Sequence, residues 1–273
     1  MIRRDTEKRH NYADDVFSKL SIFDIQGLLK EGNDYKCGIE SYHVLGFEMV
    51  NFSGLDQKVE YARYRFCSNL GIPYFVVITS EREKYFKIFR AYADGVQIIF
   101  QPFKTFTPDE FIIWWRSNQS FTQKKKMYNA ASRISKSILD SLLFENNLSW
   151  GVNIDGFIFD KTQKTVAIVE KRICTYKPPY TVENYDPNRF FHGTPYRSGD
   201  YPSWSILFSL SRKLNAALLL FTFDTSSRKK IGAACIDGVS EFSGIVYRDG
   251  VGPSSKIFTD DIFSLNKWIN QVS

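Results

Sequence analysis

Residues Val152–Arg172 read VNIDGFIFDKTQKTVAIVEKR. Both ends of this stretch are apolar with alternating polar positions, and the polar run Asp160–Lys164 separates them. The pattern predicts a β-hairpin with one carboxylate on each strand, Asp155 on the first and Glu170 on the second. Side chains two apart on a strand share a face, so Arg172 is expected beside Glu170. Two carboxylates and a cation converging on a sheet edge indicate a site for a divalent metal and a phosphodiester.

The stretch resembles the motif of the PD-(D/E)xK nuclease superfamily, in which an Asp, a hairpin and Glu-x-Lys precede a helix and another strand. Asp155 and Glu170 match this motif, whereas Arg172 stands where the family has Lys. The resemblance implies an α/β fold, a mixed sheet with helices on both sides. It also implies that Asp155 and Glu170 hold Mg²⁺, or Mn²⁺ in its place, and that the main-chain carbonyl of Lys171 completes the site.

The Arg at position 172 leaves three interpretations open. The family's Lys is taken to orient or deprotonate the attacking water, and Arg stays protonated, so Arg172 cannot be the base. It could still polarise the water and hold the phosphate, with solvent or the phosphate accepting the proton. Lys171 could swing in instead, although strand alternation aims it at the other face. The third interpretation is an inactive site.

A second, weaker copy of the same pattern lies in the first half of the chain. Gln26 takes the place of Asp155, and Tyr42 takes the place of the cation. Glu40 retains a carboxylate at the position of Glu170, so the first copy is expected to bind metal poorly and to be inactive. Four pairs of segments align in the same order: Phe23–Leu29 with Val152–Ile158, Lys36–His43 with Val166–Ile173, Leu70–Thr79 with Leu214–Phe223, and Lys104–Trp115 with Lys256–Lys267.

The predicted fold class is α/β, with two tandem restriction-endonuclease-like sandwiches forming a pseudo-dimer. Residues 1–120 are the expected degenerate repeat, and residues 121–273 are the basic repeat with the candidate site. The polar run Ser117–Lys126 is the expected linker, and Val44–Asn51 is expected to extend as a strand. Helices are expected over Asn11–Ser21, Asp56–Ser68, Thr107–Ser117, Met127–Phe144, Trp204–Leu214 and Phe258–Val272, the last with Thr259 as its N-cap.

The net charge of +6 is unevenly distributed along the chain. Residues 1–123 hold 16 Lys and Arg against 16 Asp and Glu, so the whole excess lies in residues 124–273. This favours a polyanionic partner, nucleic acid and DNA first, with a merely soluble basic surface as the alternative. The residues expected to position phosphates are Lys124, Lys125, Lys126, Arg189, Arg197, Arg212, Lys213, Arg228, Lys229 and Lys230.

The segment Cys174–Ser203 is the largest insertion in the second copy and is rich in Pro and Tyr. It is too long for an idle connection in a compact domain, so a binding role is expected. Its aromatic residues interleave with cations, as in a loop that stacks on bases, or they form an apolar cluster beneath the loop. These residues are Tyr176, Tyr180, Tyr185, Phe190 and Phe191.

The composition narrows the functional class. A hydrophobic content of 43% and a charged content of 24% are ordinary for a globular protein. The sequence has no run of 18 apolar residues and no signal-peptide pattern, which predicts an intracellular, cytoplasmic protein without a membrane partner. The four Cys show no metal-ligand spacing, and no G-x-G-x-x-G, Walker, G-x-S-x-G or HExxH motif occurs.

These observations predict an Mg²⁺-dependent DNA endonuclease, a hydrolase with a single candidate site in the second repeat. One site per chain predicts nicking, or cleavage of both strands only after self-association. The alternative is a DNA-binding or scaffolding protein that keeps the nuclease fold without the chemistry.

Overall fold

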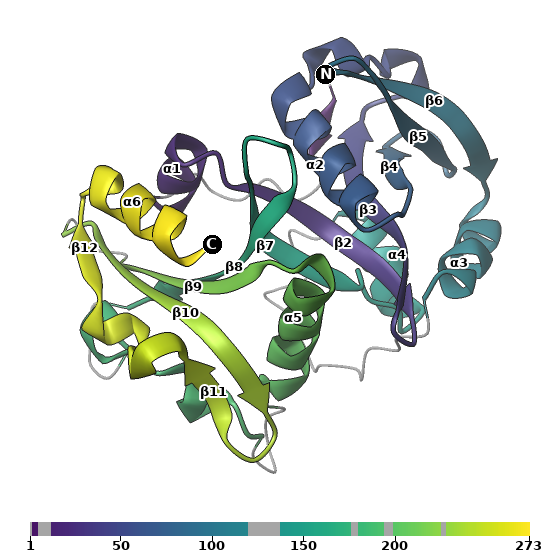
Figure 1. Cartoon of the computed structure of the whole chain (residues 1–273). Helices are drawn as coiled ribbons and strands as arrows, with labels where there is room; N and C mark the ends of the chain where they lie inside the picture. The colour runs from purple at the N-terminus through teal and green to yellow at the C-terminus, as the bar shows by residue number, and fades with distance from the viewer. Residues whose placement is uncertain (1, 5–11, 120–136, 176–179, 194–198, 225–227) are drawn as a thin grey trace. The chain divides into compact units, whose positions relative to one another are not determined.

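The computed structural model describes residues 2–4, 12–119, 137–175, 180–193, 199–224 and 228–273 (Figure 1). The chain forms two compact units, each of them an α/β arrangement around a mixed sheet, which confirms the α/β class predicted from the sequence. Unit 1 comprises Met1–Arg9 and Ile25–Asn153, and unit 2 comprises His10–Asp24 and Ile154–Ser273.

In unit 1 a hairpin, a crossover helix and three further strands build the sheet in the order β2-β3-β4-β5-β6. β3 and β4 are parallel, and the other neighbouring strands of this order are antiparallel. Its elements are β1 (Arg3–Arg4), β2 (Phe23–Glu31), β3 (Asp34–Val44), η1 (Phe47–Met49), η2 (Phe52–Gly54), α2 (Gln57–Asn69), β4 (Tyr74–Ser80), β5 (Phe86–Asp94), β6 (Gln97–Phe106), α3 (Pro108–Ser117) and α4 (Ile138–Glu145).

Unit 2 repeats this scheme in the order β7-β8-β9-β10-β11, with β8 and β9 as the parallel pair. Its elements are α1 (Tyr12–Lys19), β7 (Val152–Phe159), β8 (Thr165–Cys174), η4 (Val182–Asn184), η5 (Pro187–Phe190), α5 (Tyr201–Leu214), β9 (Ala217–Asp224), β10 (Lys230–Ser240), β11 (Gly244–Tyr247), η6 (Arg248–Gly250), η7 (Pro253–Ser255), β12 (Ile257–Thr259) and α6 (Ile262–Val272).

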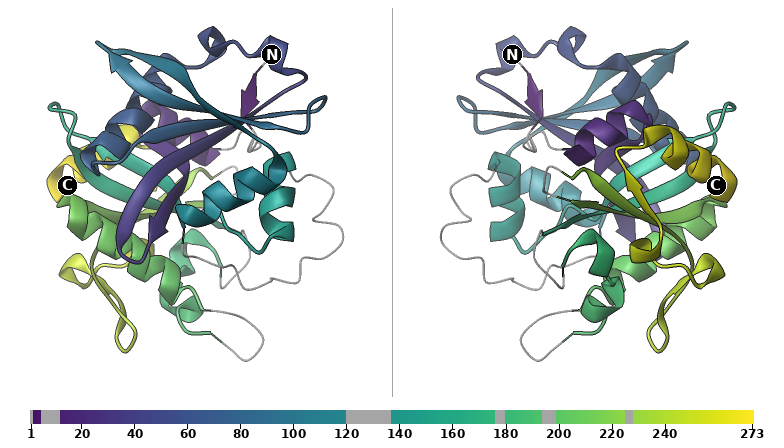
Figure 2. Two further views of the ribbon diagram at one scale, coloured as in Figure 1. Left: turned by 90° about the vertical axis from the view of Figure 1, so that its right-hand side faces the viewer. Right: turned by 90° about the vertical axis from the view of Figure 1, so that its left-hand side faces the viewer.

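Strand alternation sends the side chains of each sheet to two faces, and helices cover both (Figure 2). In unit 2, Val169 and Phe221 face α1 and α6, where they join a core that includes Phe17 and Trp268. Side chains at even-numbered positions of β8, among them Arg172, point to the other face of the sheet, toward α5. In unit 1, α3 and α4 cover one face and α2 the other. The two faces of β8 therefore lie in different surroundings.

Two helices lie in a different unit from the hairpin that follows them in sequence. α1 precedes the β2–β3 hairpin of unit 1 but belongs to unit 2, and α4 precedes the β7–β8 hairpin of unit 2 but belongs to unit 1. Val16 and Phe17 of α1 are buried in the core of unit 2, with the Phe17 ring 5.8 Å from that of Phe223. Leu139 and Leu143 of α4 are buried in the core of unit 1. The observed division thus differs from the expected 1–120 and 121–273, because α1 and α4 lie in the units opposite to those that sequence order assigns.

The strand registers coincide with the sequence alignment of the two halves. Gly27 pairs with Ile39 in the first hairpin, and the aligned Gly156 pairs with Val169 in the second. At the parallel pairs, Glu40 lies opposite Val76, and the aligned Glu170 lies opposite Leu220. The carboxylates at positions 40 and 170 therefore occupy equivalent places in their sheets.

Three local predictions need correction. Val44–Asn51 is not a strand: β3 ends at Val44, and the 3-10 helices η1 and η2 follow, with Asn51 capping the second. The last helix is capped by Asp261, whose side chain accepts from the Ser264 amide, whereas Thr259 ends strand β12. The helix expected over Met127–Phe144 is seen as α4, and its positions 127–136 lie outside the described residues.

Candidate functional site

A polar turn closes the hairpin that carries the candidate site, and the side chain of Asp160 in that turn stabilises it. Asp160 Oδ1 accepts hydrogen bonds from the Thr162 and Lys164 amides at 2.8 and 3.0 Å. Gln163 adopts a left-handed backbone conformation with φ of 65°. This polar turn holds the two apolar strands in the register that brings their far ends together.

Asp155 and Glu170 meet at that far end. The register Gly156–Val169 makes them the next facing pair along the ladder, so their side chains share a face. Asp155 Oδ2 accepts a hydrogen bond from the Lys171 amide at 3.0 Å, which places its carboxylate beside the Glu170–Lys171 peptide. Glu170 is only 8% exposed. Burial, and next the charge of Asp155, raise the pKa of Glu170 to about 8.

Arg172 lies on the same face as Glu170, as the spacing predicts. One terminal nitrogen of its guanidinium is 2.9 Å from Glu170 Oε1 and 3.5 Å from Asp200 Oδ2. The guanidinium carbon is 5.6 Å from the centre of the Trp204 ring on α5. The candidate site therefore combines three carboxylates with one guanidinium.

Lys171 points to the opposite face of the sheet. Its Nζ is 2.9 Å from Asp14 Oδ1 and 5.2 Å from the centre of the Phe17 ring, both on α1. The Lys171 side chain is thus held away from the carboxylates at positions 155 and 170. Its contribution to the site in this structure comes from its main chain.

The hairpin of unit 1 reproduces this backbone geometry with different chemistry. Gln26 Oε1 accepts from the Ser41 amide at 2.6 Å, as Asp155 does from the amide after Glu170. The main-chain amide of Gln26 donates to Glu40 Oε1 at 2.7 Å. Gln26 is a neutral counterpart of Asp155, so the first hairpin carries a single acidic group at this place.

Guanidinium groups neutralise that acidic group. Arg4 binds both oxygens of the fully buried Glu40, at 2.7 and 2.8 Å. Arg63 on α2 lies 3.4 Å from Glu40 and 2.6 Å from the buried Glu60. The hydroxyl of Tyr74 donates to Glu60 at 2.6 Å. The carboxylates of Glu40 and Glu60 are thus already paired with fixed cations in this hairpin and the helix beside it.

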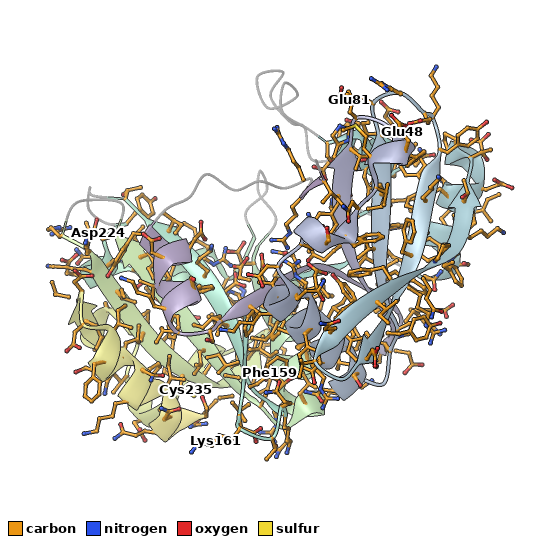
Figure 3. All side chains as sticks on the ribbon, turned by 90° about the horizontal axis from the view of Figure 1, so that it is seen from above. Glu48, Glu81, Phe159, Lys161, Asp224 and Cys235 are labelled. Atoms are coloured by element: carbon orange, nitrogen blue, oxygen red, sulfur yellow. The ribbon has the colours of Figure 1, made fainter. Side chains whose placement is uncertain are left out.

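The structure separates the residues expected to bind phosphate into three groups. Arg189, Arg212 and Lys213 are exposed, on η5 and at the end of α5. Lys124, Lys125, Lys126 and Arg197 lie outside the described residues. The third group is paired with carboxylates: Arg228 with Asp224, which Figure 3 labels, and with Glu183, Lys229 with Asp260, and Lys230 with Glu183. These ion pairs weaken the electrostatic case for phosphate contact at positions 228–230.

The aromatic residues of the inserted segment divide between core and surface. Phe191 is fully buried and Tyr185 is 9% exposed, so neither ring is open to stacking on a base at the surface. Tyr180 is 44% exposed and stacks on Phe190, with ring centres 5.8 Å apart. Tyr176 lies outside the described residues. The segment is therefore anchored to unit 2 and presents one aromatic pair near the surface.

Sequence reasoning missed the residues that come from the helices. Asp200 and Trp204 approach Arg172 from the start of α5, which was expected to begin only at Trp204. Arg63 was overlooked in unit 1, although the i, i+3 spacing of Glu60 and Arg63 permits an ion pair on one helix face. The signal at Asp200 is the sequence Asp-Tyr-Pro, because Asp favours the N-cap and Pro the first helical turn.

The residues of the β7–β8 hairpin fit a hard divalent cation by donor type. Mg²⁺ prefers carboxylate and carbonyl oxygens together with water, and Asp155, Glu170 and the Lys171 carbonyl supply such oxygens. In the described part of the chain, no group of three or more His, Cys, Asp or Glu side chains is arranged to hold a metal ion. The protein would therefore supply few ligands, leaving the other coordination positions to water and phosphate.

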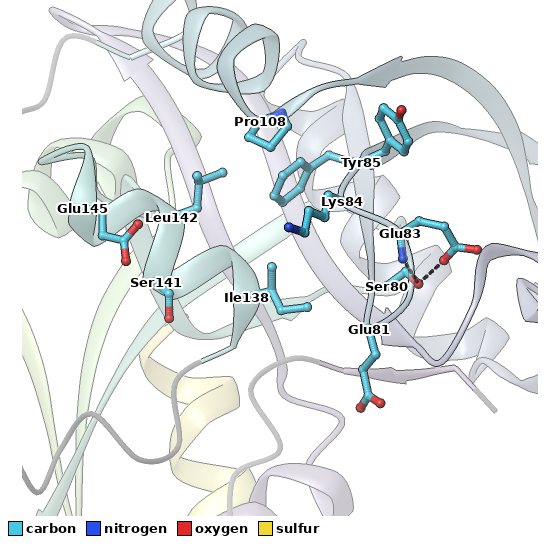
Figure 4. A pocket seen from close by; sticks show the side chains of 11 residues that line it. Ser80, Glu81, Glu83, Lys84, Tyr85, Pro108, Ile138, Ser141, Leu142 and Glu145 are labelled. Carbon is cyan, nitrogen blue, oxygen red and sulfur yellow. Dashed lines mark hydrogen bonds between the residues drawn. The ribbon is translucent and has the colours of Figure 1, made fainter.

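A separate pocket of about 440 Å³ lies in unit 1, away from either hairpin (Figure 4). Its apolar wall includes Tyr85, Phe86 and Leu142, and carboxylates of Glu81 and Glu145 lie at its rim. Glu81 Oε1 lies 3.2 Å from His43 Nε2. Of the site residues predicted from the sequence, none that the structure describes lines this pocket.

A comparison of the chain with models of known protein families, with curated proteins and with solved structures gives no match. Among the residues that the structure describes, no helix is both long enough and apolar enough to cross a membrane.

Proposed function

We propose that unit 2 is a divalent-metal-dependent endonuclease that acts on DNA, with Asp155 and Glu170 as its metal ligands. The observation that carries this proposal is the hydrogen bond from the Lys171 amide to Asp155, which sets two carboxylates from neighbouring strands side by side. Glu170 is almost fully buried, and burying a carboxylate is costly unless a cation or hydrogen bonds compensate it. A divalent cation would provide that compensation.

The proposal assigns a distinct task to each group of the site. Asp155 and Glu170 hold the cation, which when bound would polarise a phosphoryl oxygen and lower the pKa of its bound water. Arg172 stays protonated, so it stabilises charge on the phosphate, and the proton of the attacking water passes to solvent. Lys171 contributes its main-chain carbonyl, while its side chain fixes β8 against α1 through Asp14.

We further propose that the two units are diverged copies of a restriction-endonuclease-like domain. The shared strand registers and the equivalent hydrogen bonds of Gln26 and Asp155 support this relationship. Since Arg4 and Arg63 neutralise Glu40 in unit 1, one site per chain remains. A single site predicts nicking of one strand, with cleavage of both strands only when two chains act together.

Incubation of supercoiled DNA with Mg²⁺ or Mn²⁺ tests the proposal. The wild type is expected to produce nicked circles, and Asp155→Asn and Glu170→Gln should each lower the rate by about 100-fold or more, the upper end of what supporting partners of metal ligands contribute. Asp160→Asn is the matched control, because it removes a negative charge from the turn of the same hairpin but keeps the Oδ1 that accepts from the Thr162 and Lys164 amides, so the rate should be unchanged. Equal rates in wild type and the two site variants would refute the proposal.

A second candidate function is a DNA-binding or scaffolding protein without chemistry. The contact that favours it is the 2.9 Å ion pair between Arg172 and Glu170, because a guanidinium there already supplies one positive charge to the carboxylates. This candidate predicts no nicking in the same assay. It also predicts DNA binding that weakens steeply with salt and does not respond to divalent cations.

A further inference from the structure

The guanidinium of Arg172 lies between two carboxylates that come from different elements. Glu170 on β8 is 2.9 Å away, and Asp200 at the start of α5 is 3.5 Å away. The flat face of Trp204 lies alongside the guanidinium, 5.6 Å from ring centre to the guanidinium carbon. Among the residues that the structure describes, the buried Arg172 Nε has no hydrogen-bond partner, and the guanidinium lies against these two carboxylates and the Trp204 ring.

Asp200 does not perform the usual task of an Asp at a helix start. It is the N-cap residue of α5, yet its side chain makes no capping hydrogen bond. Asp56 precedes α2, the crossover helix of unit 1, and accepts hydrogen bonds from the Lys58 and Val59 amides at 2.9 and 3.3 Å. An N-cap of this type ordinarily stabilises a helix by satisfying main-chain amides of its first turn. The Asp200 carboxylate does not cap α5 and lies 3.5 Å from the Arg172 guanidinium instead.

The backbone around Asp200 is fixed by the buried part of the preceding segment. The Asp200 amide donates to the Phe190 carbonyl at 2.9 Å, and the Tyr201 amide donates to the Phe191 carbonyl at 3.1 Å. Gly199 permits this approach, because a Cβ there would lie 2.3 Å from the Phe191 carbonyl oxygen. The position of the Asp200 carboxylate is therefore set by the fold of unit 2 and does not depend on Arg172 alone.

From this geometry we infer that Asp200 is a positioning residue that shares the Arg172 guanidinium with Glu170 and thereby sets the affinity of the Asp155–Glu170 pair for a divalent cation. The inference rests on the proposed metal-dependent function. A cation that binds Glu170 is repelled by a guanidinium 2.9 Å from the same carboxylate. Asp200 offers the same terminal nitrogen of the guanidinium a second carboxylate, 3.5 Å away, so Arg172 can turn toward it when Glu170 binds the cation.

Removing Asp200 should therefore strengthen the competition between Arg172 and the metal. Within the described residues, Glu170 would then be the carboxylate left within ion-pair distance of Arg172. Removing Arg172 as well should cancel the effect, since no guanidinium would remain to be positioned. A residue that acts only through another shows this dependence in a double-mutant cycle.

Calorimetric titration with Mn²⁺ of the wild type, Asp200→Asn, Arg172→Gln and the double variant tests the inference. Asp200→Asn is expected to weaken Mn²⁺ binding about 10-fold, and Arg172→Gln to tighten it, within the range of coupling between contacting residues. In the Arg172→Gln background, the effect of Asp200→Asn should shrink to less than about 2-fold. Because Asp200 makes no capping bond and Asn keeps the shape of the side chain, the thermal unfolding midpoint of Asp200→Asn should fall by no more than about 4 °C, the effect of losing one ion pair.

Two results would overturn the inference while the metal site stands. One is an equal weakening of Mn²⁺ binding by Asp200→Asn in both backgrounds, which would make Asp200 a ligand or a general source of negative charge. The other is no weakening by Asp200→Asn although Asp155→Asn abolishes binding. Wild-type protein that shows no Mn²⁺ binding sensitive to Asp155→Asn would refute the inference and the metal site together.

Discussion

Replacing Arg63 by Met is expected to destabilise unit 1 by about 3–5 kcal/mol, the usual cost of removing one partner from a buried ion pair. Arg63 is 3% exposed and lies against two carboxylates, Glu40 and Glu60, which are 0% and 1% exposed. Without the Arg63 guanidinium, the partners left to Glu60 among the described residues would be the Tyr42 and Tyr74 hydroxyls. Glu40 would keep Arg4 as its ion-pair partner and the main-chain amide of Gln26. Peptide-resolved hydrogen exchange measures this loss, because it reports the two units separately.

Lys58→Met is the matched control for Arg63→Met. It removes the same charge from an exposed position of the same helix and should change stability by no more than about 0.5 kcal/mol. The double variant Arg63→Met with Glu60→Gln should recover part of the loss, because one of the two buried charges is then removed. Equal protection of unit 1 in Arg63→Met and wild type would contradict the assignment of Arg63 as the counterion in this hairpin.

Phe17→Ala is expected to destabilise unit 2 by about 3–5 kcal/mol, as for other fully buried aromatic residues, although position 17 lies in the N-terminal part of the chain. The Phe17 ring packs 5.8 and 6.3 Å from the rings of Phe223 and Phe221 on β9. It also covers the Lys171 side chain. Faster hydrogen exchange should therefore appear in peptides of β8 and β9, which begin 148 and 200 residues after Phe17.

Ser18→Ala serves as the control for Phe17→Ala, because Ser18 is the exposed neighbour on the same helix. Peptides of unit 1 should exchange at wild-type rates in both variants. Increased exchange in unit 1, with unit 2 unaffected, would show that α1 packs where sequence order alone would place it.

The hairpin of unit 2 could be predicted because its information is local. Alternation over Asn153–Phe159 and Thr165–Arg172 gives the two strands, and the polar residues between them give the turn. The same alternation predicted that Arg172 and Lys171 would face opposite sides, and the contacts with Trp204 and Asp14 confirm this. Alignment of the two halves also matched the strand registers.

The partners of these residues could not be predicted, because they depend on which elements pack together. Arg63 reaches Glu40 from a helix 23 positions later, and Asp200 reaches Arg172 from the start of α5. The packing of α1 in unit 2 and of α4 in unit 1 has no sequence signal, since both helices have eight residues and each buries two or three apolar side chains that either core could accept. The ion pairs of Arg228 and Lys230 with Glu183 could not be predicted from the sequence either, because Glu183 lies about 45 residues away.

The central claim is that the chain holds one divalent cation, at Asp155 and Glu170 of unit 2. Equilibrium titration with Mn²⁺, followed by the electron paramagnetic resonance signal of the free ion, measures the number of bound ions per chain directly. We predict one Mn²⁺ bound by the wild type and by Glu40→Gln, and none by Asp155→Asn or Glu170→Gln. Mn²⁺ bound equally by all four proteins, or by none of them, would contradict the claim.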